Sequence, residues 1–161
     1  MHTTISTNAL QPGTPAPDFS LASTIGQMLS LSQFRGQPVI LAFYPADGSP
    51  VCSSQLALYN EAFPMFAEYN AQLLAISVDD ISSHNAFAGQ YNLKFPLLAD
   101  VDPQGAVSRT YGVYDEAERS SQRALFVIDG EGSIHWSYVS PPEVNPGAHG
   151  VLSALDTLNA L

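Results

Sequence analysis

The sequence contains a single cysteine, Cys52, among its 161 residues. One cysteine cannot form a disulfide within the chain, a CxxC redox pair or a cysteine-rich metal site. Any redox chemistry at Cys52 therefore needs a partner from outside the chain. The four histidines lie far apart in the sequence, at His2, His84, His135 and His149. Because they lack the close spacing of metal ligands, we expect no metal site.

Positive charge is also scarce. Five Lys and Arg residues stand against fifteen Asp and Glu residues, which gives a formal net charge of −10. Nucleic-acid binders neutralise phosphates with a basic surface, and an anionic membrane would repel this chain. We therefore expect no nucleic-acid partner and no membrane partner. The simplest role for the acidity is solubility.

Long hydrophobic runs are absent, since none approaches the ~20 residues of a membrane-spanning helix. Residues 1–10 contain neither a basic start nor an apolar stretch, so the sequence predicts no secretory signal and a cytoplasmic location. Hydrophobic residues make up 45% of the chain, enough for a sizeable core. With no repeat or linker, residues 1–161 are expected to form one domain, with 1–11 as a loose N-terminal arm.

The order of apolar segments indicates an α/β fold. Strands are expected at 18–21, 27–31, 38–44, 72–78, 95–99, 124–129 and 134–139. Helices are expected after residue 49, at 82–91 with a serine at its start, at 103–111 and from about 147. Pro64 should kink or interrupt the first of these helices. The order predicts a central mixed β-sheet with helices on both faces.

The turn that follows the buried segment 38–44 places Cys52 at the start of a helix. Ser49 is a preferred N-cap residue, and Pro50 suits the first helical position because its missing N–H would be unpaired there. In the first turn, unpaired N–H groups and the positive end of the helix dipole favour a thiolate over a thiol. A lone cysteine is, however, often only a small buried apolar side chain. The local pattern leaves both interpretations open.

The segment Pro45-x-x-x-Ser49-x-x-Cys52 resembles the peroxiredoxin signature Pro-x-x-x-Thr/Ser-x-x-Cys, and Tyr44 and Asp47 match its usual surroundings. Further segments follow the order of that family, at 13–19, 31–44, 95–100, 111–113 and 123–129. Among peroxiredoxins, the chain is most similar to the single-cysteine alkyl hydroperoxide reductase E and bacterioferritin-comigratory branch.

This resemblance implies a thioredoxin-like fold and the reduction of hydroperoxides without a cofactor. Cys52 would be the nucleophile that attacks the peroxide and becomes a sulfenic acid. Arg123 would lie beside the thiolate and stabilise it, because a guanidinium carries a permanent charge and several donors. Ser49 would hold the peroxide, and Pro45 would shield the thiolate from water. The resemblance also suggests a homodimer.

Each flanking residue has a plainer alternative role. Arg123 could be a solvated surface charge, Ser49 only an N-cap, and Pro45 only the end of a strand. Two positions depart from the family pattern, since Gln55 stands where many relatives have Glu and Ala57 where some have a resolving cysteine. Without that second cysteine, the sulfenic acid must be reduced by an external thiol of the thioredoxin, glutaredoxin or low-molecular-weight type.

Two other functions remain open for the same residues. A redox sensor would pass the oxidation of Cys52 to a partner protein instead of turning over peroxide. A silent thioredoxin-fold binding module would carry an ordinary thiol, and the intact Pro/Ser/Cys/Arg set argues against it. A copper-chaperone variant would need a CxxxC pair and a matched histidine, which the sequence lacks.

Overall fold

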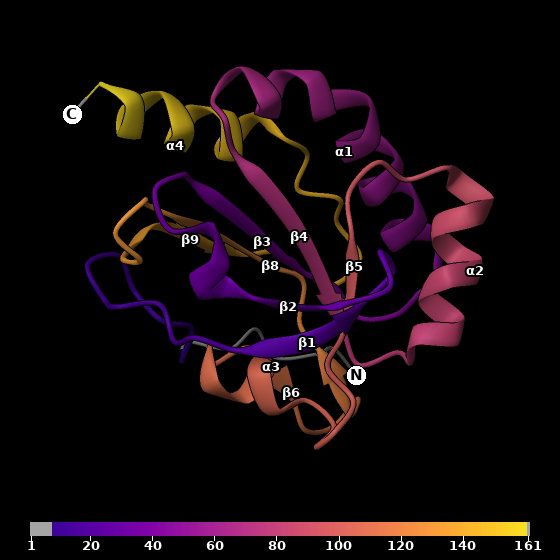
Figure 1. Cartoon of the computed structure of the whole chain (residues 1–161). Helices are drawn as coiled ribbons and strands as arrows, with labels where there is room; N and C mark the ends of the chain where they lie inside the picture. Colours follow the sequence, from indigo (N-terminus) through magenta and orange to yellow (C-terminus); the bar gives the residue numbers. More distant parts are fainter. Residues whose placement is uncertain (1–7, 161) are drawn as a thin grey trace.

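Seven strands form one mixed sheet in the computed structural model, which describes residues 8–160 (Figure 1). Their spatial order is β2 (Met28–Ser30), β1 (Ser20–Ser23), β5 (Leu97–Ala99), β4 (Gln72–Ser77), β3 (Val39–Phe43), β8 (Ala124–Ile128) and β9 (Ile134–Val139). The pairs β3–β4 and β4–β5 are parallel, and the other neighbours are antiparallel. A small second sheet joins β6 (Tyr114–Asp115) to β7 (Ser120–Ser121), neither of which was expected from the sequence.

Strand β3 is buried along its whole length, as its continuous apolar sequence predicted. It lies between β4 and β8, so that Leu41 is paired with Leu74 on one side and Phe126 on the other. Side chains of a strand alternate between the two faces of its sheet. Leu41 therefore packs into one hydrophobic core, and its neighbours Ile40 and Ala42 pack into another.

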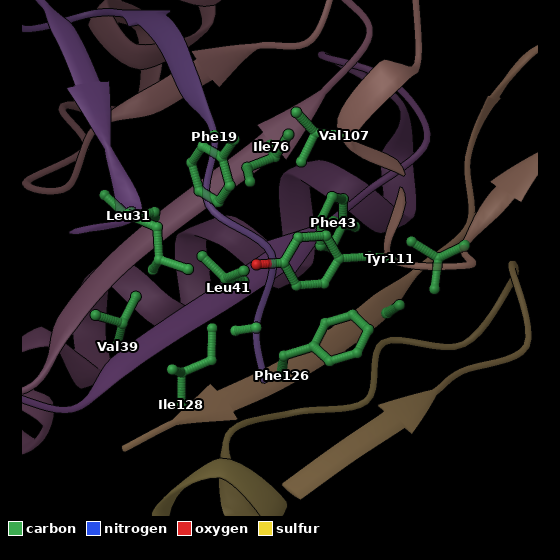
Figure 2. Close-up of a cluster of buried hydrophobic side chains, with 14 of the residues drawn as sticks. Phe19, Leu31, Val39, Leu41, Phe43, Ile76, Val107, Tyr111, Phe126 and Ile128 are labelled. Atoms are coloured by element: carbon green, nitrogen blue, oxygen red, sulfur yellow. The ribbon is translucent and has the colours of Figure 1, made fainter. Parts of the chain in front are cut away.

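The two cores lie on opposite faces of the sheet. Figure 2 shows the first, in which the rings of Phe43, Tyr111 and Phe126 pack with centroids 5.2 to 5.8 Å apart. The short helices η1 (Leu31–Phe34) and α3 (Ala106–Thr110) contribute to this core. The second core is built with α1 (Pro50–Glu68), α2 (Ile81–Tyr91) and α4 (His149–Asn159). The expected mixed sheet with helices on both faces is confirmed.

Two details of the helices differ from the sequence-based expectation. Helix α1 continues through Pro64 to Glu68, so the expected interruption is wrong. A proline inside a helix removes one backbone hydrogen bond, and the burial of Phe66 two residues later holds this last part of α1 against the core. Helix α2 is capped by Asp80 and not by a serine, because the Asp80 carboxylate accepts the Ser83 N–H at 2.9 Å.

Part of the N-terminal segment packs against the fold. Residues 1–7 of the expected loose arm lie outside the described residues. Beyond them Ala9 is buried, and the Leu10 N–H donates to the Tyr111 carbonyl at 3.1 Å. Between residues 8 and 160, no helix has both the length and the apolar character needed to cross a bilayer.

Candidate active site

Cys52 lies in the first turn of α1, as the sequence predicted. Ser49 occupies the N-cap position with an extended backbone, and Pro50 is the first helical residue. The Ser49 hydroxyl does not cap the helix, because it donates to the Ala46 carbonyl at 3.3 Å. The first N–H groups of α1 thus receive no acceptor from the Ser49 side chain, and such groups attract an anion.

Arg123 reaches Cys52 from the start of β8, which lies beside the carboxyl end of β3. It directly precedes β8, whose first residue Ala124 is paired with Phe43 at the end of β3. The Arg123 Nη1 donates to the Cys52 Sγ at 3.3 Å, although 71 residues separate the two in the chain. Cys52 is 0% exposed and Arg123 is 3% exposed. Arg123 is therefore a buried partner of the thiol and not a surface charge.

Three further hydrogen bonds hold the guanidinium in this position. Nε and Nη2 both donate to the Pro142 carbonyl, at 3.1 and 2.7 Å, and Nη1 donates to the Gln55 Oε1 at 2.9 Å. The Gln55 Nε2 donates to the Tyr59 hydroxyl, which donates in turn to the Gly147 carbonyl, each at 3.0 Å. Burial raises the pKa of Tyr59 to about 12, so its hydroxyl keeps the proton that it donates. Gln55 and Tyr59 thus form a hydrogen-bonded support for Arg123.

Among residues 8–160, the guanidinium of Arg123 forms no ion pair with a carboxylate. Gln55 supplies an oxygen but no charge. Burying an unpaired ion costs several kcal/mol, so a nearby anion is strongly favoured. The Cys52 sulfur, as a thiolate, is the group placed to compensate the guanidinium. The pair is therefore arranged for nucleophilic chemistry at sulfur.

The other two predicted site residues lie in the turn that precedes Cys52. Pro45 follows the last buried residue of the β3 segment, Tyr44, and is half-buried. Ser49, also half-buried, closes the turn three residues before the cysteine. The structure thus brings Cys52 and Arg123 into direct contact and places Pro45 and Ser49 at the two ends of the adjoining turn.

A second buried cluster, centred on Asp47 in the same turn, was missed at the sequence level. The Asp47 carboxylate accepts hydrogen bonds from the Tyr44 hydroxyl at 2.6 Å, the Ser83 hydroxyl at 2.8 Å and the His84 Nδ1 at 2.7 Å. Burial raises the pKa of Asp47, but the hydrogen bonds from His84 and Tyr44 and the charge of His84 outweigh burial and leave that pKa below its usual value. The sequence feature that could have indicated a buried His84 is its three-residue spacing from Phe87, which places both on the buried face of α2.

Within the described residues, this cluster also contains three side chains close enough together to coordinate a metal ion. One ligand atom each from Asp47, Asp79 and His84 lies within 4.8 Å of the others. Both ring nitrogens of His84 are already engaged, one with Asp47 and the other with the Leu98 carbonyl at 2.9 Å. Asp79 accepts the Asp47 N–H at 2.8 Å and the Ser77 hydroxyl at 2.6 Å. These groups therefore satisfy one another by hydrogen bonding.

Several solved structures resemble this chain over almost its whole length. The AhpC of Enterococcus faecalis superposes with a TM-score of 0.86 at 28% sequence identity, over 94% of this chain and 93% of that one. The peroxidoxin BcpB of Mycobacterium tuberculosis superposes with a TM-score of 0.81 at 31% identity, over 94% and 98% of the two chains. The expected thioredoxin-like fold is confirmed by these similarities.

Sequence comparison leads to the same group of proteins. The AhpC/TSA family matches residues 12–137. A thioredoxin peroxidase of Fasciola hepatica is 35% identical over 157 residues, which are 91% of this chain and 80% of the relative. An alkyl hydroperoxide reductase E of Mycobacterium bovis is 36% identical over 134 residues, covering 83% and 88%. The chain therefore belongs to the AhpC/TSA family, the peroxiredoxins, whose members are thiol-dependent peroxidases.

Proposed function

We propose that this peroxiredoxin reduces hydroperoxides at Cys52 and depends on an external thiol to regenerate it. The observation that carries the proposal is the contact between the Arg123 Nη1 and the Sγ of the only cysteine, 3.3 Å apart. A buried guanidinium without a carboxylate partner stabilises the thiolate that a peroxide oxidises. Hydrogen peroxide and organic hydroperoxides are both substrates of this chemistry.

The first step is a displacement at the terminal peroxide oxygen. The Cys52 thiolate attacks that oxygen, the S–O bond forms as the O–O bond breaks, and the released alkoxide or hydroxide takes up a proton to leave as alcohol or water. The product on the enzyme is a sulfenic acid. Arg123 stabilises the negative charge as it moves from sulfur to the leaving oxygen. Ser49 hydrogen-bonds to the bound peroxide, and Pro45 restricts the access of water to the sulfur.

The second step uses thiols from outside the chain. A first external thiol attacks the sulfenic acid, releases water and forms a mixed disulfide with Cys52. A second thiol attacks this disulfide and restores the Cys52 thiol. The reductant belongs to the thioredoxin, glutaredoxin or low-molecular-weight class, and one relative is itself described as a thioredoxin peroxidase. We place the enzyme in the cytoplasm, as a homodimer.

Oxidation by one equivalent of hydrogen peroxide tests this function. The mass of the intact protein should rise by one oxygen within seconds, and its thiol titre should fall in parallel. Cys52→Ser should show neither change and should lack turnover with any thiol. A wild-type Cys52 that remains a thiol for minutes would exclude the peroxidase. Fast oxidation with poor turnover by small thiols would instead favour the redox sensor.

A further inference from the structure

We propose that His84 is a positioning residue, which holds the turn 45–49 in the geometry where Cys52 meets the peroxide. Its side chain is fully buried on α2, which packs beside β5 (Figure 1). The ring reaches Asp47, the middle residue of that turn, at 2.7 Å. The inference deepens the proposed function and assigns a role to a group that does not touch Cys52.

The hydrogen-bond partners of His84 determine where its protons lie. The Leu98 carbonyl can only accept, so Nε2 carries a proton. The Asp47 carboxylate also accepts from the Tyr44 and Ser83 hydroxyls, and so it acts as an acceptor towards Nδ1 as well. In this arrangement both ring nitrogens of His84 donate, and the ring forms an ion pair with the Asp47 carboxylate.

Asp47 ties the turn to three neighbouring parts of the fold. Its carboxylate is bound by Tyr44 at the end of the β3 segment and by Ser83 and His84 of α2. Its N–H donates to the carboxylate of Asp79, in the connection between β4 and α2. Because Ser49 is bonded to Ala46, next to Asp47, the turn is tied to the fold through the carboxylate and the N–H of Asp47.

The position of the turn matters because the Cys52 sulfur is buried. A small peroxide has only to reach the sulfur between Arg123 and the first turn of α1. A larger thiol or an alkylating reagent needs the sulfur exposed, so residues near Cys52 must move outward first. With Asp47 held, only the short segment 48–52 can move. When the Asp47 contact is lost, the mobile segment becomes longer and outward movement becomes easier.

Removing His84 leaves the Asp47 carboxylate buried without its counter-ion, which strongly destabilises its present position. His84→Ala should therefore shift the turn towards solvent and affect two reactions in opposite directions. Alkylation of Cys52 by iodoacetamide should become about tenfold faster, and oxidation by hydrogen peroxide about tenfold slower. A tenfold change corresponds to ~1.4 kcal/mol between the closed and open arrangements.

Two control variants separate this role from a general loss of stability. Ser108→Ala removes hydroxyl hydrogen bonds to Asp100 and Ser121 in a different buried cluster, on the other core. It should lower the unfolding midpoint but leave both rates of Cys52 near wild type. Asp47→Asn keeps a group that can donate to a neutral His84 Nδ1, so both of its rates should lie between those of wild type and His84→Ala.

The experiment measures both rates by mass spectrometry and stopped flow, and it uses the full chain with its single reactive thiol. Rates in His84→Ala that match wild type, or that shift in the same way in Ser108→Ala, overturn the proposal. If His84→Ala does not fold, ¹⁵N NMR of the wild-type ring decides instead. Two protonated ring nitrogens at neutral pH support the assignment, and one bare nitrogen overturns it. Alkylation requires no peroxidase chemistry, so a failure of the proposed function would be seen separately, as inert Cys52 in the peroxide arm.

Discussion

Two buried cations flank the turn 45–49, and they differ in what balances their charge. Arg123 faces a sulfur and a neutral amide, at 3.3 and 2.9 Å. His84 faces the Asp47 carboxylate at 2.7 Å. Around Arg123, the group that can balance the positive charge is the reactive sulfur of Cys52. Around His84, it is the Asp47 carboxylate, which holds the turn and does not react. A cation that stabilises a reactive anion must therefore lack a carboxylate neighbour, whereas a cation that holds a turn needs one.

The largest effect should come from removing the cation of the reactive region. Arg123→Ala leaves the Cys52 thiolate without its charged donor, and oxidation by hydrogen peroxide at neutral pH should slow by about 10²–10³-fold, as for the loss of one strong electrostatic donor. Stopped-flow kinetics measures the rate, and circular dichroism checks the fold. Arg123→Lys keeps the charge but loses the paired bonds to the Pro142 carbonyl. Its oxidation rate should therefore lie between those of wild type and Arg123→Ala. Wild-type kinetics in Arg123→Ala would remove this residue from the mechanism.

A smaller effect on the oxidation rate should follow from giving Arg123 a carboxylate neighbour, as His84 has in Asp47. Gln55→Glu would place a carboxylate on Arg123, so that the guanidinium no longer depends on the thiolate for its counter-charge. Oxidation of Cys52 at neutral pH should slow by about tenfold, the effect of ~1.4 kcal/mol. Gln55→Met, of similar size and without charge, is the control; an equal effect in both variants would contradict the role of charge.

The smallest effect concerns the stability of the Asp47 region in acid. Hydrogen bonds lower the pKa of Asp47 in the folded state despite its burial, so the folded state binds a proton less readily than the unfolded one. This contribution to stability is fully present above the unfolded value of about 4 and is lost as the pH falls through the lower folded value. Urea unfolding from pH 6 to pH 3 should therefore show a steeper loss for wild type than for Asp47→Asn. Parallel curves would mean that the carboxylate does not stabilise the fold.

Much of the fold could be predicted because the relevant signals are local. The apolar run 38–44 and the turn residues Ser49 and Pro50 predicted a central strand, a helix start and the place of Cys52. The two-residue strands β6 and β7 could not be predicted, since such short segments have no periodicity. The continuation of α1 through Pro64 also depends on packing, which local preference does not describe.

The candidate site was predictable only in part. Arg123 was expected beside Cys52 on the strength of a family resemblance, and the contact between them is present. Another of its acceptors, the Pro142 carbonyl, belongs to the irregular segment after β9, where no sequence pattern indicates a backbone orientation. His84 looked like one of four scattered histidines because 37 residues separate it from Asp47.

The sequence by itself determined the number of thiols and the excess of acidic residues, because both follow from counting. One cysteine means that Cys52 has no disulfide partner within the chain, whatever the fold. Only the tertiary structure decided which charges meet. The energy of a charge pair depends on distance and on burial, and both are set by how remote segments pack together. The fold therefore gave Arg123 a sulfur and His84 a carboxylate, and this assignment separates the reactive cation from the structural one.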